Sequence, residues 1–378
     1  MKQRIALALA ACAVFVGLVT WRADAMPPFA QAYGVKCSLC HVMVPALNAY
    51  GRYVQRTGYA SIPPEALKGV FPLWFGENTS YSTTDATYPH QLKFGNVALH
   101  AIGEIGNDWS YHAQQWIVQG EQQGNLDTGW LAYNNLAHRN GHLFIGKIEA
   151  AGPSPFSQWT DISTFATPEI TVGEHVYQND ANRWGARFAY IRGNIDAEVG
   201  WLGSGGGWSG ISDFSNDTDK SLSYKFAIAD PTKPTEYGIY GSRGSFPLAE
   251  GGYDQYRSTA AYVERDPVGN MPGFFGIYQI GYDGNPGAGA PSSTSHAATL
   301  EVYQTFFHHN LMLGLRRELT NDGMGNIIGT GQVEMAVQFA KYLHGYAEGS
   351  MGQFSTPTWN YMLWWTVPLN RNPRPPDT

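Results

Sequence analysis

Charge and cysteine are both scarce in this chain. Only 15% of its 378 residues are charged, and its three cysteines are Cys12, Cys37 and Cys40. A zinc knuckle needs two pairs of ligands, and only one cysteine pair, Cys37 and Cys40, stands outside the first 25 residues. We also find no nucleophile–base arrangement, no phosphate-binding glycine loop and no His-Glu-x-x-His motif, so nothing indicates a hydrolase or a transferase.

Long apolar runs and excess positive charge are missing as well. After the first 25 residues, no run reaches the roughly 18 apolar residues expected of a transmembrane helix. The chain has 24 Lys and Arg against 31 Asp and Glu, a net charge of −7, which argues against nucleic acid as a partner. Aromatic residues (14%) and glycine (44 residues) are plentiful instead, as in β-rich proteins with aromatic surfaces.

The first 25 residues predict a signal peptide. Lys2 and Arg4 precede the apolar run Ile5–Val19, and Ala23-Asp24-Ala25 forms a cleavage site, so the mature chain would begin at Met26. The chain is therefore expected to be exported.

A lipoprotein box at Leu9–Cys12 is an alternative interpretation of this stretch. It would leave a very short apolar core before the modified cysteine and a strongly apolar segment after it, so we favour the signal peptide. Removing residues 1–25, which carry three positive charges and one negative charge, lowers the net charge from −7 to −9.

The motif Cys37-Ser38-Leu39-Cys40-His41 predicts attachment of one c-type haem. Two thiols three residues apart can each add to a vinyl group of the same haem, and the following His41 can then reach the iron. A redox dithiol would not need the trailing histidine. Export agrees with this prediction, because c-type haem is attached on the exported side of the inner membrane.

We expect residues 26–68 to form a short α-helical segment around the haem. Pro45 can occupy a first helical turn. The apolar face of this helix would pack on the haem plane, with Gly51 permitting close approach. Arg52 and Arg56 could pair with the haem propionates or face solvent. The residues of the apolar face are Leu47, Tyr50, Gly51 and Val54.

This segment is too short for a self-sufficient core, so it must lean on its haem and on the chain that follows. Ser61–Pro64 is interpreted as a linker to that chain. The sixth iron ligand is left open, because no Met or His lies between Met43 and His90. The candidates are Met26, His90 and His100, with an open coordination site as a further alternative.

Residues 69–369 show alternating apolar and polar residues, which predicts a long series of β-strands. The clearest hairpin turns at Gly193-Asn194, so that Tyr190 pairs with Ala197 and Phe188 with Val199. Its apolar side chains would then share one face. The charged residues expected on the other face, where carboxylates balance arginines, are Arg183, Arg187, Asp196 and Glu198.

Such a pattern fits either a soluble β-sandwich or an outer-membrane barrel with its apolar face toward lipid. Strand length, aromatic residues near strand ends and alternation of tight with long connections favour an antiparallel barrel of about 16 strands. Tight turns are expected at Gly193-Asn194 and His308–Asn310, and a closing strand at Trp359–Val367. The expected long loops are 151–168, 204–217, 284–296 and 321–329. Residues 370–378 form a polar tail.

The haem segment resembles the start of the fused monohaem cytochrome–porins, outer-membrane proteins of iron-oxidising bacteria. The resemblance rests on Phe29-Ala30, Gly34, the haem motif, Pro45-x-Leu47-x-x-Tyr50-Gly51-Arg52 and Gly58-Tyr59, and it touches Gly146-Lys147 and Pro155–Trp159. The family commonly reads Phe-Ala-Arg-Gln-Thr-Gly where this chain has Gln31-Ala32-Tyr33 before Gly34, which indicates a divergent member with scope for another electron donor or acceptor.

The resemblance implies a short haem segment held in or against the pore, and electron transfer from Fe(II) or another extracellular donor to a periplasmic carrier, a c-type cytochrome or a copper protein. The implied location is the outer membrane, in contact with its lipid. Two other functions stay open at this stage. The haem segment could be a structural or gating plug of a porin, or the chain could be a soluble periplasmic cytochrome with a β-sandwich domain.

Overall fold

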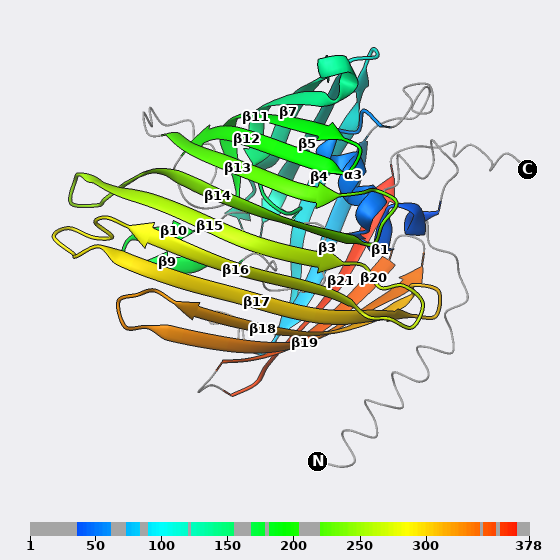
Figure 1. The fold of residues 1–378 in the computed structure, drawn as a ribbon. Coiled ribbons are helices and arrows are strands. Elements are labelled where there is room, and N and C mark those ends of the chain that lie inside the picture. The colour runs from blue at the N-terminus through cyan, green and yellow to red at the C-terminus, as the bar shows by residue number, and fades with distance from the viewer. Residues whose placement is uncertain are drawn as a thin grey trace, which may run out of the picture.

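The computed structural model shows one closed antiparallel barrel with a small N-terminal segment inside it (Figure 1). The leader, Met26, most of the linker and the polar tail lie outside the residues that the structure describes. The described residues are 36–61, 73–83, 90–119, 122–154, 168–177, 181–203, 220–340, 343–352 and 356–368.

The barrel contains 16 full-length strands, and each is paired with its neighbours in chain order. The two-residue strand β6, Gln122–Gln123, adds to β5 beside β7. The full-length strands are β3 Leu73–Ser82, β4 Leu92–Ile105, β5 Trp109–Gln119, β7 Leu126–Leu136, β8 Gly141–Glu149, β11 Asn182–Arg192, β12 Ile195–Gly203, β13 Lys220–Ala229, β14 Thr235–Pro247, β15 Tyr253–Arg265, β16 Gly273–Asp283, β17 Ser293–Phe306, β18 Leu311–Asn321, β19 Ile327–Ala340, β20 Leu343–Gly352 and β21 Thr358–Pro368.

The predicted closing strand is confirmed, since β21 pairs with β3 and completes the ring. The predicted hairpin is confirmed to the residue, with Tyr190 opposite Ala197 and Phe188 opposite Val199. A closed barrel has no unpaired sheet edge, and this excludes the β-sandwich alternative.

Alternation along each strand separates two faces of the barrel wall. In β12, Asp196 and Glu198 are buried in the lumen, whereas Val199 and Trp201 are exposed on the outside. The pleat of a strand sends successive side chains to opposite faces, so the apolar positions form a continuous outward band. Because the strands are paired all the way round the ring, this band faces lipid.

The connections differ at the two ends of the barrel. The predicted turns at Gly193-Asn194 and at His308–Asn310 are confirmed as tight connections at one end. The long connections lie at the other end, but two are shorter than expected, because β17 begins at Ser293 and β19 at Ile327. The expected loop 204–217 and most of the expected loop 151–168 lie outside the described residues. Short turns of outer-membrane barrels face the periplasm, which orients the chain.

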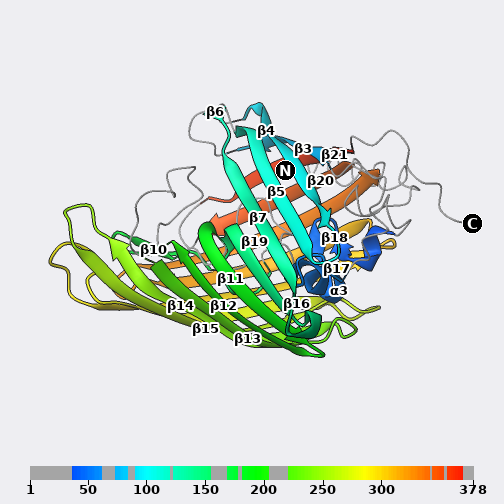
Figure 2. The same ribbon diagram turned by 90° about the horizontal axis from the view of Figure 1, so that it is seen from above.

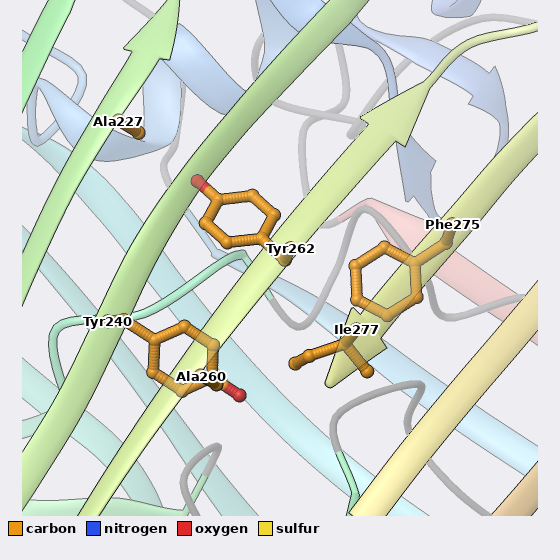
Figure 3. Close-up of a cluster of buried hydrophobic side chains, with 6 residues drawn as sticks. All are labelled: Ala227, Tyr240, Ala260, Tyr262, Phe275 and Ile277. Atoms are coloured by element: carbon orange, nitrogen blue, oxygen red, sulfur yellow. The ribbon is translucent and has the colours of Figure 1, made fainter. Parts of the chain in front are cut away.

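Among the described residues, two pieces of chain lie in the lumen. The N-terminal segment lies at the end of the tight turns, and the hairpin of β9 (Ile170–Val172) and β10 (His175–Tyr177) lies toward the other end (Figures 1 and 2). The lumen wall between β13 and β16 also carries an aromatic and aliphatic cluster (Figure 3). Its members are Ala227, Tyr240, Ala260, Tyr262, Phe275 and Ile277.

Candidate haem site

The haem motif begins the described N-terminal segment. A 3-10 turn, η1 (Cys37–Leu39), leads into two short paired strands, β1 (His41–Met43) and β2 (Ala46–Leu47), followed by the helix α3 (Ala49–Arg56). The prediction that Pro45 opens a helix is wrong, because Pro45 lies in the turn between β1 and β2 and the helix begins four residues later. No helix in the described part of the chain is long and apolar enough to span a membrane.

Asn48 explains where the helix begins. Its side-chain oxygen accepts a hydrogen bond from Gly51 N at 3.0 Å, which satisfies a backbone donor at the helix start. Its side-chain amide donates to the carbonyls of Ser38 and Leu39, each at 3.1 Å. One residue therefore caps α3 and fastens the haem loop to the helix.

Gly51 holds the loop and the helix together at their closest point. An added Cβ at this position would overlap the Cys40 carbonyl oxygen and come within 3.0 Å of Leu47 Cδ2. The approach of Gly51 to the haem plane stays a prediction; the close contact that the structure shows is with the backbone of the motif. Only glycine permits this contact without moving the motif.

Gly51→Ala is therefore expected to displace the Cys40 carbonyl and to reduce attachment of the predicted haem. Overpacking of this kind costs about 1–3 kcal/mol. Gly276→Ala is the matched control, because the nearest atom to an added Cβ there is 3.6 Å away. Haem per barrel, measured by absorbance, would fall for the first variant and stay unchanged for the second; equal haem content in both would contradict this role.

His41 is held in the form that can bind iron. It is buried, and its Nδ1–H donates to the Pro45 carbonyl at 2.9 Å. Burial lowers the pKa of His41 to about 4, so the imidazole is neutral at physiological pH. Donation from Nδ1 leaves the lone pair on Nε2, which is the arrangement that metal-binding histidines adopt. The imidazole thus fits an axial ligand of haem.

The cysteines fit thioether attachment better than redox chemistry. Neither Cys37 nor Cys40 is in a disulfide, and burial raises the pKa of the Cys40 thiol to about 11. A redox dithiol needs a stabilised thiolate, which burial disfavours. With His41 beside them, the two thiols match the donor set of a c-type haem site.

Arg52 and Arg56 dock the segment on the barrel wall. Arg52 is fully buried, and its guanidinium contacts Glu236 and Glu264 at 2.9 Å and Asp266 at 2.8 Å. Arg56 contacts Glu236 at 2.9 Å and Asp196 at 3.3 Å. The expectation of a solvated face is therefore wrong. Their pairing with haem propionates stays a prediction, although wall carboxylates already bind both side chains.

Glu198, the neighbour of Asp196 on β12, pairs with Arg187 at 3.4 Å, as expected for the charged face of the predicted hairpin. Lys225 of β13 contacts Asp196 at 2.7 Å and Glu198 at 3.2 Å. Sequence reasoning missed this lysine, because its partners lie on a different hairpin.

Asp266 and Tyr346 add further contacts between the segment and the wall. Asp266 accepts a hydrogen bond from Ala49 N at 2.8 Å, at the start of α3. Tyr346 of β20 donates from its hydroxyl to the Val44 carbonyl at 3.0 Å. The segment is thus held at two separate places on the ring, by β20 and by the connection that follows β15.

The apolar face of α3 packs on the barrel. Val54 is buried with Tyr59, Trp74 of β3 and Ile102 of β4, and Tyr50 packs against this group. Tyr50 and Val54 therefore do form an apolar face of the helix, as predicted. In the structure this face packs on the lumen wall. Helical spacing in the sequence shows that a face is apolar and does not say what covers it.

Two of the predicted candidates for the sixth ligand, His90 and His100, lie among the described residues. Met26 is outside the described residues. His90 is exposed in the connection between β3 and β4. His100 of β4 stacks on Trp74, with ring centroids 4.7 Å apart. The structure brings none of these side chains to the imidazole of His41 among the contacts it describes.

A second cluster with metal-ligand chemistry joins the β9–β10 hairpin to the wall. His175, Asp254 and Asp283 are buried, and one ligand atom from each lies within 4.8 Å of the others. His175 Nδ1 is 2.7 Å from Asp283, and the Tyr177 hydroxyl donates to the same carboxylate at 3.0 Å. These contacts account for the hairpin's position, which the sequence did not reveal.

Comparison with known proteins identifies the fold. No known protein family matches the sequence, and no curated protein matches it. Solved structures do match. The OmpT outer membrane protein of Vibrio cholerae has a TM-score of 0.53 and 10% identity over 78% of this chain and 98% of its own. The anion-selective porin from Comamonas acidovorans has a TM-score of 0.54 at 10% identity, with the same coverages of 78% and 98%.

These similarities, at such low identity, concern the fold alone. Together with the closed ring and the outward apolar band, they confirm the predicted architecture and location. The chain forms a 16-stranded antiparallel β-barrel of the outer membrane with the fold of porins, and its lumen holds a short N-terminal segment.

Proposed function

We propose that this protein is an outer-membrane electron conduit that carries one c-type haem on Cys37, Cys40 and His41. The observation that carries the proposal is the docking of the haem motif inside the lumen, at the mouth with the tight turns, with His41 neutral and its Nε2 available. When bound, the haem supplies a one-electron ferric–ferrous couple.

The ion pairs and hydrogen bonds of the N-terminal segment determine where in the barrel the haem would exchange electrons. Arg52, Arg56 and Asp266 hold the motif at the periplasmic mouth, within reach of a soluble one-electron carrier such as a c-type cytochrome or a copper protein. The rest of the lumen extends toward the long loops. A donor from outside must therefore enter the barrel to meet the site.

The charge of the lumen favours a small cationic donor. Buried carboxylates line the wall from β14 to β20, on the way between the two mouths. Fe(II) attracted by these groups would release one electron to the haem and leave as Fe(III), and the electron would pass to the periplasmic carrier. Of these carboxylates, Glu236 and Glu264 already bind Arg52, and the others are Asp254, Asp283, Glu301, Glu334 and Glu348.

Proteoliposomes test this direction of flow. The holoprotein would be reconstituted with oxidised cytochrome c trapped inside and Fe(II) added outside under anaerobic conditions. We expect reduction of the trapped cytochrome only in vesicles that contain the protein. Reduction at the rate of protein-free vesicles, with haem present and the barrel intact, would reject the conduit.

A porin with a structural plug is the second candidate, and the filled lumen favours it. The N-terminal segment and the β9–β10 hairpin both occupy the lumen. Planar-bilayer recordings separate the two functions. Steady ion conductance without electron transfer to the trapped carrier would favour the plugged porin, whereas low conductance with electron transfer favours the conduit.

A further inference from the structure

We infer that His344 of β20 is the second axial ligand of the haem iron, opposite His41. This inference rests on the proposed function, because it assumes that the motif carries haem. His344 was not among the candidates from the sequence. It comes from the far end of the barrel sequence and reaches the motif only through the closed fold.

The first observation is that His344 is buried without a hydrogen-bond partner. The residue is only 2% exposed, and among the described residues neither Nδ1 nor Nε2 finds a partner. Leaving a buried polar group unpaired costs about 1–3 kcal/mol, so native proteins rarely do so without a reason. Coordination to a metal would satisfy one nitrogen directly.

The second observation is the position of His344 beside the haem motif. Its imidazole is close enough to that of His41 for the two rings to interact electrostatically. Two residues along the same strand, Tyr346 donates to Val44, three residues after His41. Tyr346 also packs with Val42 and Met43. The strand that follows the motif therefore lies on the face of β20 that carries His344.

The surroundings suit an imidazole ligand. Trp364 lies opposite His344 on β21, with ring centroids 5.8 Å apart, and joins Met362 beside the cluster of Val42 and Met43. Among the described residues, this apolar setting offers the ring nitrogens of His344 no hydrogen-bond partner. By contrast, the electrostatic neighbour of His100 is His112, which leaves His344 as the wall histidine coupled to the motif.

Such a ligand would tie the two parts of the chain together. The proximal ligand belongs to the N-terminal segment and the distal ligand to the barrel, so iron coordination would add to the ion pairs of Arg52 and Arg56 in docking the segment. Neutral imidazoles from both sides also favour a low-spin iron, which needs little rearrangement on electron transfer. The geometry thus matches the proposed role in electron transfer.

Electron paramagnetic resonance of the ferric holoprotein tests the inference. We expect a low-spin signal of bis-histidine type for the wild type. His344→Ala should convert it to high-spin, let the ferrous form bind carbon monoxide, and regain the low-spin signal when imidazole is added. His344→Met should stay six-coordinate but raise the midpoint potential, because thioether ligation raises the potential of haem.

His112→Ala is the matched control. His112 is also a buried wall histidine with an unpartnered ring nitrogen, but its electrostatic neighbour is His100. The control should keep the low-spin signal. Barrel folding is checked for every variant by its heat-dependent gel mobility, and covalent haem by staining after denaturation.

The outcomes separate this inference from the proposed function. A His344→Ala protein that keeps the wild-type low-spin signal overturns the inference, and so does a wild type that is high-spin. In both cases haem is bound, so the proposed site stands. A wild type without covalent haem would instead remove the site itself.

Discussion

Replacing both Cys37 and Cys40 with serine is expected to abolish covalent haem while leaving the barrel folded. The two thioether bonds are the only covalent links that the motif offers, and serine cannot form them. The purified variant should lose haem staining after denaturation and lose its c-type absorbance band. Transfer of electrons from Fe(II) should fall to the level of protein-free vesicles.

Cys12→Ser gives a control within the same chain. Cys12 lies in the predicted leader, so its replacement should leave the mature protein and its haem unchanged. Single replacements of Cys37 or Cys40 should each keep one thioether bond and shift the absorbance band. Full haem staining in the double variant would show that the motif is not the attachment site.

Replacing Arg52 with methionine is expected to release the N-terminal segment from the lumen. Arg52 is fully buried, and its loss leaves Glu236, Glu264 and Asp266 with too little positive charge. Removing one partner of a buried ion-pair network costs about 3–5 kcal/mol. Ion conductance of the barrel should rise, and α3 should become open to protease.

Arg139→Met is the control for Arg52. Arg139 also pairs with a carboxylate, that of Asp108 at 3.0 Å, but its side chain is 58% exposed. Exposed pairs contribute about 0–1 kcal/mol, so this variant should behave like wild type. A second test adds Glu264→Gln and Asp266→Asn to the Arg52 variant, which removes unpaired charge and should restore part of the docking. If the Arg52→Met protein conducted ions no better than wild type and the Arg139→Met protein, Arg52 would not be the anchor of the segment.

The barrel could be predicted from the sequence because its signals are local. Alternation fixes which side chains share a face, and a two-residue turn at Gly193-Asn194 fixes the register of its hairpin, so Tyr190 and Ala197 meet as expected. Closure by β21 on β3 followed from the count and length of strands. None of these features requires knowledge of contacts across the lumen.

The interior could not be predicted in the same way. Arg52 meets Glu236, Glu264 and Asp266 across sequence separations of about two hundred residues, and no local pattern encodes those pairs. No local pattern singles out His344 either, because the residues around it in β20 alternate as in the other strands. The β9–β10 hairpin was missed because its strands have three residues each, too few for a periodic signal.

The start of α3 illustrates a competition between two local signals. Pro45 is well suited to a first helical turn, but Asn48 caps the helix with its side chain and binds the haem loop at the same time. Asn48 makes these additional hydrogen bonds, and the helix begins directly after it. The motif Cys37–His41 itself was clear from the sequence, because its chemistry depends on spacing alone.

Anaerobic stopped-flow spectroscopy of the detergent-purified holoprotein mixed with Fe(II) tests the central claim most directly. We expect rapid growth of the reduced c-type α-band. This growth should be slower in a variant where lumen carboxylates such as Glu334 and Glu348 are replaced by glutamine. A haem that stays oxidised with Fe(II) but is reduced by dithionite would contradict iron as the donor and leave a haem-bearing barrel with another partner.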